Sequence, residues 1–209
     1  AMIVIYQQPG SNAVAVGGKV KAAMERLSQR FPDGVEAATI VDSTTSIDAG
    51  VKDIFRTLVI ALILVIFIIF LFLQDWRATV IPLVAIPVSL VGAFALFPLL
   101  GFSINIISLL GLVLAIGLVV DDAIVVVENV DRIMNEEHLS PYEATKKAMS
   151  NLSGALIAMS LVLCAVFVPV SFLSGITGQL YRQFTITIAV SVLISTFVAL
   201  TLSPALCAL

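Results

Sequence analysis

Hydrophobic residues dominate the chain from about residue 57 onward, in five long runs separated by polar stretches. The runs cover about 55–73, 78–100, 104–128, 152–173 and 184–206. Each is close to the roughly 20 apolar residues that an α-helix needs to cross the hydrocarbon core of a bilayer. The pattern therefore predicts a mostly α-helical membrane bundle over residues 51–209, with about five transmembrane helices.

Residues 1–50 follow a different pattern, which is typical of a water-soluble segment. Short apolar runs at 1–6 and 35–41 suit buried strands, and apolar residues spaced by three and four between Ala13 and Leu27 suit one face of a helix. This order predicts part of a small α+β (ferredoxin-like) subdomain. Because one such unit cannot bury its own sheet face, we expect its partner to lie outside this sequence.

The basic residues of the linkers predict the orientation in the membrane. The linkers after the first and third spans are richer in Lys and Arg than those after the second and fourth, so we expect them in the cytoplasm and residues 1–50 in the periplasm. Lys52 and Arg56 flank the first span on the outer side and count against this orientation. The basic residues compared are Arg77, Arg132, Lys146 and Lys147 on the inner side and Arg182 on the outer side.

The long inner linker contains the sequence Ser140-Pro141-Tyr142-Glu143. A capping serine, a proline at the first helical position and an acid in the first turn are typical of a helix start. We therefore expect a short amphipathic helix over about 141–150 that lies along the membrane surface.

The composition supports a membrane protein and gives no sign of a nucleic acid, a metal or a cofactor as ligand. The 209 residues are 60% hydrophobic and 12% charged, whereas a soluble domain is about 45–50% apolar and about 25% charged. A net charge of -3 without a basic tract gives no reason to expect nucleic acid. Cys164 and Cys207 lie in apolar runs and are interpreted as small buried hydrophobes, so we expect no disulfide and no metal. Gly10 to Lys19 lacks the spacing of a phosphate-binding loop, and we expect no cofactor.

Both ends of the sequence suggest a piece of a longer protein. No basic region precedes the first apolar residues, as a signal peptide would require. The last residues, Ala208 and Leu209, lie inside an apolar stretch. We therefore expect an interior fragment, whose function belongs to the longer protein.

Asp121 and Asp122 are the candidate functional residues, because they stand within the third apolar span. Two carboxylates at mid-membrane cost roughly 5–7 kcal/mol, and the Leu, Ile and Val residues of the span return on the order of 5–10 kcal/mol. The segment can therefore insert, but the net free energy that favours its insertion is small. Ionisable residues inside a membrane are by default candidates for ion or proton carriage.

A proton carrier is the first interpretation of this pair. Burial opposes ionisation of a carboxyl group, adjacent acids titrate as a pair, and neighbours on a helix are about 100° apart, so both can face one cleft. The alternative is a purely structural ion pair with a basic residue on another helix. No Lys or Arg occurs between Arg77 and Arg132 or within the fourth and fifth spans, so either interpretation places the basic partner outside this sequence. Glu128 lies on the same helical face and is interpreted as a solvated carboxylate at the membrane interface.

The sequence GLVVDDAIVVVENVDR at 117–132 resembles the fourth membrane helix of resistance-nodulation-division efflux pumps, in their hydrophobe/amphiphile branch. The resemblance extends to 70–92, to the inner linker with SPYEATKKAMS, to 152–208 and to residues 1–50, which are similar to the end of a periplasmic porter subdomain. It implies a proton/drug antiporter of the inner membrane, with Asp121 and Asp122 as proton-relay acids. It also implies a homotrimer that works with a periplasmic adaptor and an outer-membrane channel.

Three other functions compete with drug efflux. A protein-export accessory subunit belongs to the same superfamily. An intramembrane aspartyl protease needs two acids that converge on one water, usually from separate helices, which adjacent residues fit poorly. The sequence expressed alone could also be an inactive piece, since half a bundle with two unpaired acids is not expected to transport.

Overall fold

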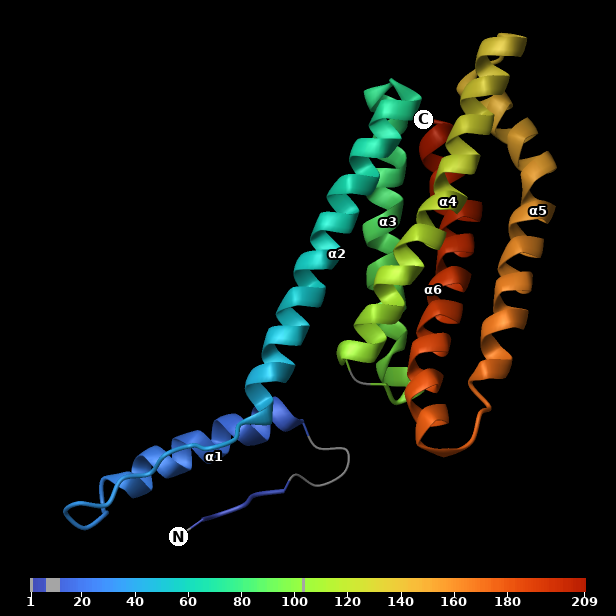
Figure 1. Cartoon of the computed structure of the whole chain (residues 1–209). Coiled ribbons are helices and arrows are strands. Elements are labelled where there is room, and N and C mark those ends of the chain that lie inside the picture. The colour runs from blue at the N-terminus through green and yellow to red at the C-terminus, as the bar shows by residue number, and fades with distance from the viewer. Residues whose placement is uncertain (1, 7–11, 103) are drawn as a thin grey trace. The chain divides into compact units, whose positions relative to one another are not determined.

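The structure is a computed structural model that describes residues 2–6, 12–102 and 104–209, without the side chains of residues 72, 73, 77, 176, 177 and 179. Two compact units divide the chain, Ala1–Asp53 and Ile54–Leu209. The described residues form six α-helices and one 3₁₀ helix (Figure 1). They are α1 (Ala13–Ser28), α2 (Ser43–Leu73), α3 (Trp76–Leu96), η1 (Pro98–Leu100), α4 (Ile106–Glu137), α5 (Pro141–Val170) and α6 (Gly175–Cys207).

Five helices carry segments that are long and apolar enough to cross a membrane. Among the described residues these segments are Ser43–Leu71, Ala78–Leu100, Ile106–Glu137, Pro141–Val170 and Leu180–Cys207. The prediction of a mostly helical protein with five candidate membrane spans is thereby confirmed, and these spans support a multi-pass membrane protein.

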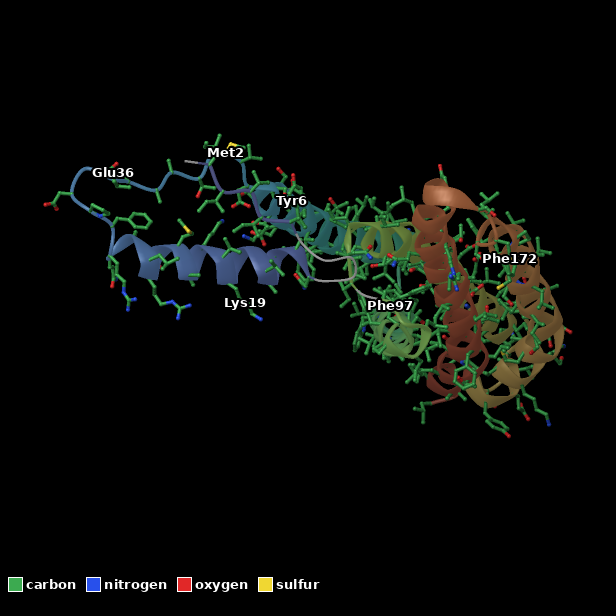
Figure 2. All side chains as sticks on the ribbon, turned by 90° about the horizontal axis from the view of Figure 1, so that it is seen from below. Met2, Tyr6, Lys19, Glu36, Phe97 and Phe172 are labelled. Atoms are coloured by element: carbon green, nitrogen blue, oxygen red, sulfur yellow. The ribbon has the colours of Figure 1, made fainter. Side chains whose placement is uncertain are left out.

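The first unit differs from the predicted α+β arrangement. Residues 2–6 and 35–41, where strands were expected, form no strand in the described part of the chain. Their apolar side chains are largely exposed, 86% for Tyr6 and 85% for Val41. Figure 2 labels Met2 and Tyr6, which belong to residues 2–6. A strand is stable only when its backbone groups pair with a neighbour. Without such pairing, α1 and the start of α2 are the regular structure of this unit.

Local contacts hold α1 to the start of α2. Asn12 caps α1 by accepting from the backbone N–H of Ala15. Asp42 accepts from the backbone N–H and the hydroxyl of Thr44, at 2.9 and 2.6 Å, and forms an ion pair with Lys21 on α1. The Lys21 ammonium, followed by the Thr44 donors, holds the pKa of the Asp42 carboxyl well below its usual range.

Helix α4 is central to the bundle, because it packs against α3, α5 and α6. Its start is fixed by a capping box, in which Asn105 accepts from the backbone of Ser108 and the Ser108 hydroxyl accepts from the backbone of Asn105. One core cluster joins α4 to α3 around Ile86 and Leu112. A second cluster joins the later turns of α4 to α5 and α6 around Val126 and Ala199.

Helix α5 differs from the expectation of a separate surface helix at about 141–150. Ser140 caps it and Pro141 begins it, as predicted, but the helix continues without a break to Val170. Ala144, Thr145 and Ala148 are buried, and the two alanines belong to the core cluster with α4 and α6. The linker residues therefore pack on the bundle as the first turns of the fourth span, because they present a small apolar face to it.

Helices α4 and α6 run parallel and approach each other closely (Figure 1). A Cβ atom added at Gly111 of α4 would lie 3.0 Å from the backbone oxygen of Phe184 and 3.3 Å from the Thr187 side chain on α6. A Cβ added at Gly117, also on α4, meets nothing within 4 Å. The two glycines therefore form a matched pair for testing this packing.

We expect Gly111→Ala to lower the melting temperature of the purified protein, because the added methyl group forces α4 and α6 apart. Overpacking of this kind costs about 1–3 kcal/mol. Gly117→Ala is the control and should be neutral or stabilising by about 0.5–1 kcal/mol, because alanine favours the helix. Thermal unfolding in detergent measures both. Equal melting temperatures for the two variants would contradict the close approach of α4 and α6.

Candidate functional site

Asp121 and Asp122 lie midway along α4, about 24 Å along the axis from its first residue. This stretch remains helical because it has no Gly or Pro break after Gly117, and its valines and isoleucines pack on neighbouring helices. The two acids are thus held on a continuous helix at the level of the bundle core. Neighbouring residues on a helix point about 100° apart, and the two carboxylates have different surroundings.

Asp122 faces α6 and is 7% exposed. The Ser195 hydroxyl lies 2.9 Å from Asp122 Oδ2 and 3.1 Å from the backbone oxygen of Val119. The Thr196 hydroxyl lies 3.3 Å from the same Oδ2 and 3.0 Å from the backbone oxygen of Val192. Each hydroxyl has one proton, so it can donate either to the carboxylate or to the carbonyl. Two donors from α6 therefore satisfy a carboxylate that the bundle has removed from water.

Asp121 is exposed on α4 and does not face α6. Among the described residues it has no hydrogen-bond or ion-pair partner. Helix α6 packs along a single stripe of α4, and that stripe contains Asp122 and not Asp121. A cleft that both acids border would include residues outside this sequence and stays a prediction. Asp121 instead presents its carboxylate on a separate face of the helix.

No basic side chain pairs with either acid in the part of the chain that the structure describes. The ion pairs found there join Lys21 to Asp42, Lys52 to Asp48, Arg132 to Glu136 and Lys147 to Glu137. Arg182 on α6 is thirteen residues before Ser195, which is about 20 Å along the helix. A basic partner outside this sequence stays a prediction.

Glu128 lies two turns beyond Asp121 on the same face of α4 and is exposed. It lines a cavity of about 250 Å³ together with Val125, Asn129 and Arg132. The Asn129 Oδ1 atom is buried and has no hydrogen-bond partner among the described residues. Polar side chains therefore recur on this face of α4 at Glu128, Asn129 and Arg132, separated from Asp121 by the apolar residues Ile124 and Val125.

Ser195 and Thr196 were not among the predicted site residues. Serine and threonine are common in apolar helices, where their hydroxyls often donate to the carbonyl four residues earlier. Thr196 does so in this structure. The pattern that could have indicated this site is the spacing of four between Thr187, Ser191 and Ser195 on α6. This pattern indicates a site only once the structure places Asp122 opposite Ser195.

Comparison with known proteins identifies the family. The family model described as "AcrB/AcrD/AcrF family" matches residues 1–209. The chain is 49% identical over 208 residues to Multidrug resistance protein MdtF of Escherichia coli (strain K12), covering 100% of this chain and 20% of that protein. It is 48% identical over 199 residues to Multidrug export protein AcrF of the same organism and to Toluene efflux pump membrane transporter TtgE of Pseudomonas putida, covering 95% of this chain and 19% of each.

The chain spans about a fifth of the length of these curated relatives. The names of the relatives describe multidrug and solvent transporters, and the resemblance to resistance-nodulation-division efflux pumps is thereby confirmed. Since the family match covers every residue of the sequence, the chain belongs to the AcrB/AcrD/AcrF family.

Proposed function

We propose that this chain is part of a proton-driven efflux pump in the bacterial inner membrane that exports drugs and other amphiphilic compounds by proton antiport. The observation that carries the proposal is the Asp122 carboxyl group, buried at mid-helix and within hydrogen-bond distance of two hydroxyls from α6. The names of the relatives support the substrate class, since they describe export of drugs and toluene.

The surroundings of Asp122 suit both protonation states of its carboxyl group. When the group is ionised, the hydroxyls of Ser195 and Thr196 donate to it. When it is protonated, its own O–H can donate to either hydroxyl oxygen, and the hydroxyl protons can turn to the carbonyls of Val119 and Val192. Proton binding thus removes a charge from the α4–α6 contact and exchanges its hydrogen bonds, which favours a different packing of the two helices.

Asp121 completes the proposed relay on the other face of α4. Its carboxylate is exposed in this chain, so a basic side chain from the rest of the longer protein can approach it. The proposed topology places residues 1–50 in the periplasm, as part of a porter subdomain. The proposed assembly is a homotrimer joined to a periplasmic adaptor and an outer-membrane channel, as the family resemblance implies.

The geometry disfavours the aspartyl protease. That chemistry needs two carboxyl groups on one water, whereas Asp122 faces α6 and Asp121 does not. The chain expressed alone should also be inactive, because Asp121 has no partner among the described residues. Vesicles that contain only this chain should therefore show no Asp-dependent proton flux.

The test of the proposed function uses the complete protein that carries this chain, reconstituted in vesicles without ATP. With a pH gradient imposed, a fluorescent amphiphile should be transported, and its addition should accelerate the opposing proton movement that a trapped pH dye reports. An uncoupler should stop both. Transport that persists after the gradient collapses, or that requires ATP, would contradict proton antiport.

A further inference from the structure

A series of hydroxyl residues follows one side of α6 toward its first turns. Thr187, Ser191 and Ser195 recur at every fourth position, and all three are buried. Gln183, four residues before Thr187, accepts a hydrogen bond from the Asn105 side chain at the start of α4. Polar groups therefore occur at each step from Asp122 to the end of the α4–α6 pair.

The hydroxyl residues of this series and Gln183 meet α4 at successive points along the interface between α4 and α6. Gln183 meets Asn105, Thr187 lies against Gly111, and Ser195 meets Asp122. Asn105 and Gln183 are only half-buried. The series therefore connects a partly exposed end of the two helices with the buried carboxyl group.

Thr187 is the unusual member of the series. It is 1% exposed, and its hydroxyl has no hydrogen-bond partner among the described residues. Four described hydroxyls of α6 donate to a carbonyl of their own helix, and Ser191 donates to the Thr187 oxygen at 2.8 Å. The Ser203 hydroxyl of α6 is also buried and has no partner among the described residues. A buried hydroxyl without a protein partner costs free energy and is usually satisfied by water. A valine at this position would have the same shape without that cost.

The spacing of the series suits hydroxyls that alternate with water molecules. Four residues of an α-helix rise about 6 Å, so neighbouring hydroxyls are too far apart to bond directly. One water between two oxygens spans about 5.5 Å, because each O–H···O bond is about 2.7–2.8 Å long. A hydroxyl with one proton and two lone pairs can accept a proton on one side and release one on the other.

We propose that Thr187, Ser191 and Ser195 form, with bound water at the Thr187 hydroxyl, a hydrogen-bonded path that carries protons between the outer end of α4 and α6, marked by Gln183, and Asp122. The path is about 18 Å long. It rests on the proposed function and on the proposed orientation, which places Asn105 on the periplasmic side. Asp122 is then loaded with protons along the α4–α6 contact, whereas Asp121 lies outside this path.

Close packing alone does not account for the series. Gly111 already provides the close approach of α4 to α6 at Thr187. Alanine or valine would fill the same positions at a helix contact in a membrane. The buried Thr187 hydroxyl, which has no partner among the described residues, therefore favours a polar ligand at this contact, and the length of two hydrogen bonds through one water matches the spacing of neighbouring hydroxyls.

The test compares substitutions on α6 in the complete transporter, in vesicles with a trapped pH dye. Thr187→Val should slow proton movement at least about tenfold, because a positioned proton-transfer group contributes on the order of 10²–10⁴-fold and water can replace part of it. Thr187→Ser should retain most of the rate. Thr185→Val is the control, since that buried hydroxyl donates to the Tyr181 oxygen of its own helix at 2.8 Å.

Ser191→Ala provides a second test that leaves the contact at Gly111 unchanged, in case Thr187→Val does not fold. It should slow proton movement while the pH midpoint of carbodiimide labelling at Asp122 stays the same.

If the Thr187 hydroxyl had only a structural role, proton movement would be slowed equally in Thr185→Val and in Thr187→Val. Normal rates in both Thr187→Val and Ser191→Ala, with a functional wild type, would overturn the path but leave the proposed function intact. A wild-type protein without any coupled proton movement would overturn both.

Discussion

Asp122→Asn in the complete transporter is expected to abolish drug export while the protein still inserts and folds. Asparagine has the shape of aspartic acid, and its carbonyl oxygen can accept from Ser195 and Thr196 as the carboxylate does. It cannot bind and release a proton, so export should fall on the order of 100-fold or more. The melting temperature should stay the same or rise, because a neutral amide is less costly to bury than a carboxylate.

Resistance to a toxic amphiphile, measured in a strain that lacks its own pumps, reports this loss, and an immunoblot of membranes reports the amount of protein. Asp131→Asn is the matched control, because Asp131 is an exposed acid on the same helix that accepts a hydrogen bond from Asn135. It should leave resistance unchanged. Asp121→Asn should also abolish export. Normal resistance in cells that carry Asp122→Asn would rule out Asp122 as the proton carrier.

The double substitution Ser195→Ala with Thr196→Val is expected to reduce export on the order of 100-fold, although both acids remain. These two hydroxyls are the hydrogen-bond partners of Asp122 among the described residues. A hydrogen bond to a charged group contributes about 1.5–3 kcal/mol, so the ionised carboxylate loses roughly 3–6 kcal/mol of stabilisation. The variant should release its proton only into a more alkaline solution, because the ionised state has become costly.

Export rates measured across a range of internal pH test this second expectation. The deficit should shrink as the compartment that receives the proton becomes more alkaline. Thr201→Val is the control, since the Thr201 hydroxyl is exposed and donates to the Phe197 oxygen of its own helix. An unchanged pH profile in the double variant, with normal export, would show that the hydroxyls of α6 do not support Asp122.

Much of the bundle could be predicted because bilayer thickness and apolar run length determine a membrane span almost directly. The second span, predicted at 78–100, coincides with the segment Ala78–Leu100. The structure of the polar linker was harder to predict, because the segment from Pro141 to Ser150 has too few apolar residues to be distinguished from a surface helix. Its alanines pack on α4 and α6, and this packing makes α5 continuous.

The first unit shows the opposite limit of sequence reasoning. A short apolar run suits a buried strand, but a strand forms only with a partner for its backbone. Residues 2–6 and 35–41 have the apolar composition of buried strands, but their backbones do not pair with a neighbouring strand among the described residues. In the membrane site, the charge of Asp121 and Asp122 was visible in the sequence. Which of the two acids meets Ser195 depends on the rotation of α4 against α6, which no local pattern records.

The continuity of α5 has a mechanical consequence. A helix of 30 residues is about 45 Å long, whereas the hydrocarbon core is about 30 Å thick, so roughly a third of α5 extends beyond the core. A tilt of about 10° in the embedded part would displace the Pro141 end by roughly 8 Å if the helix moves as one rod. A rod of this kind would act as a lever, and it would convert a small rotation inside the membrane into a large movement of the loop at His138 to Ser140.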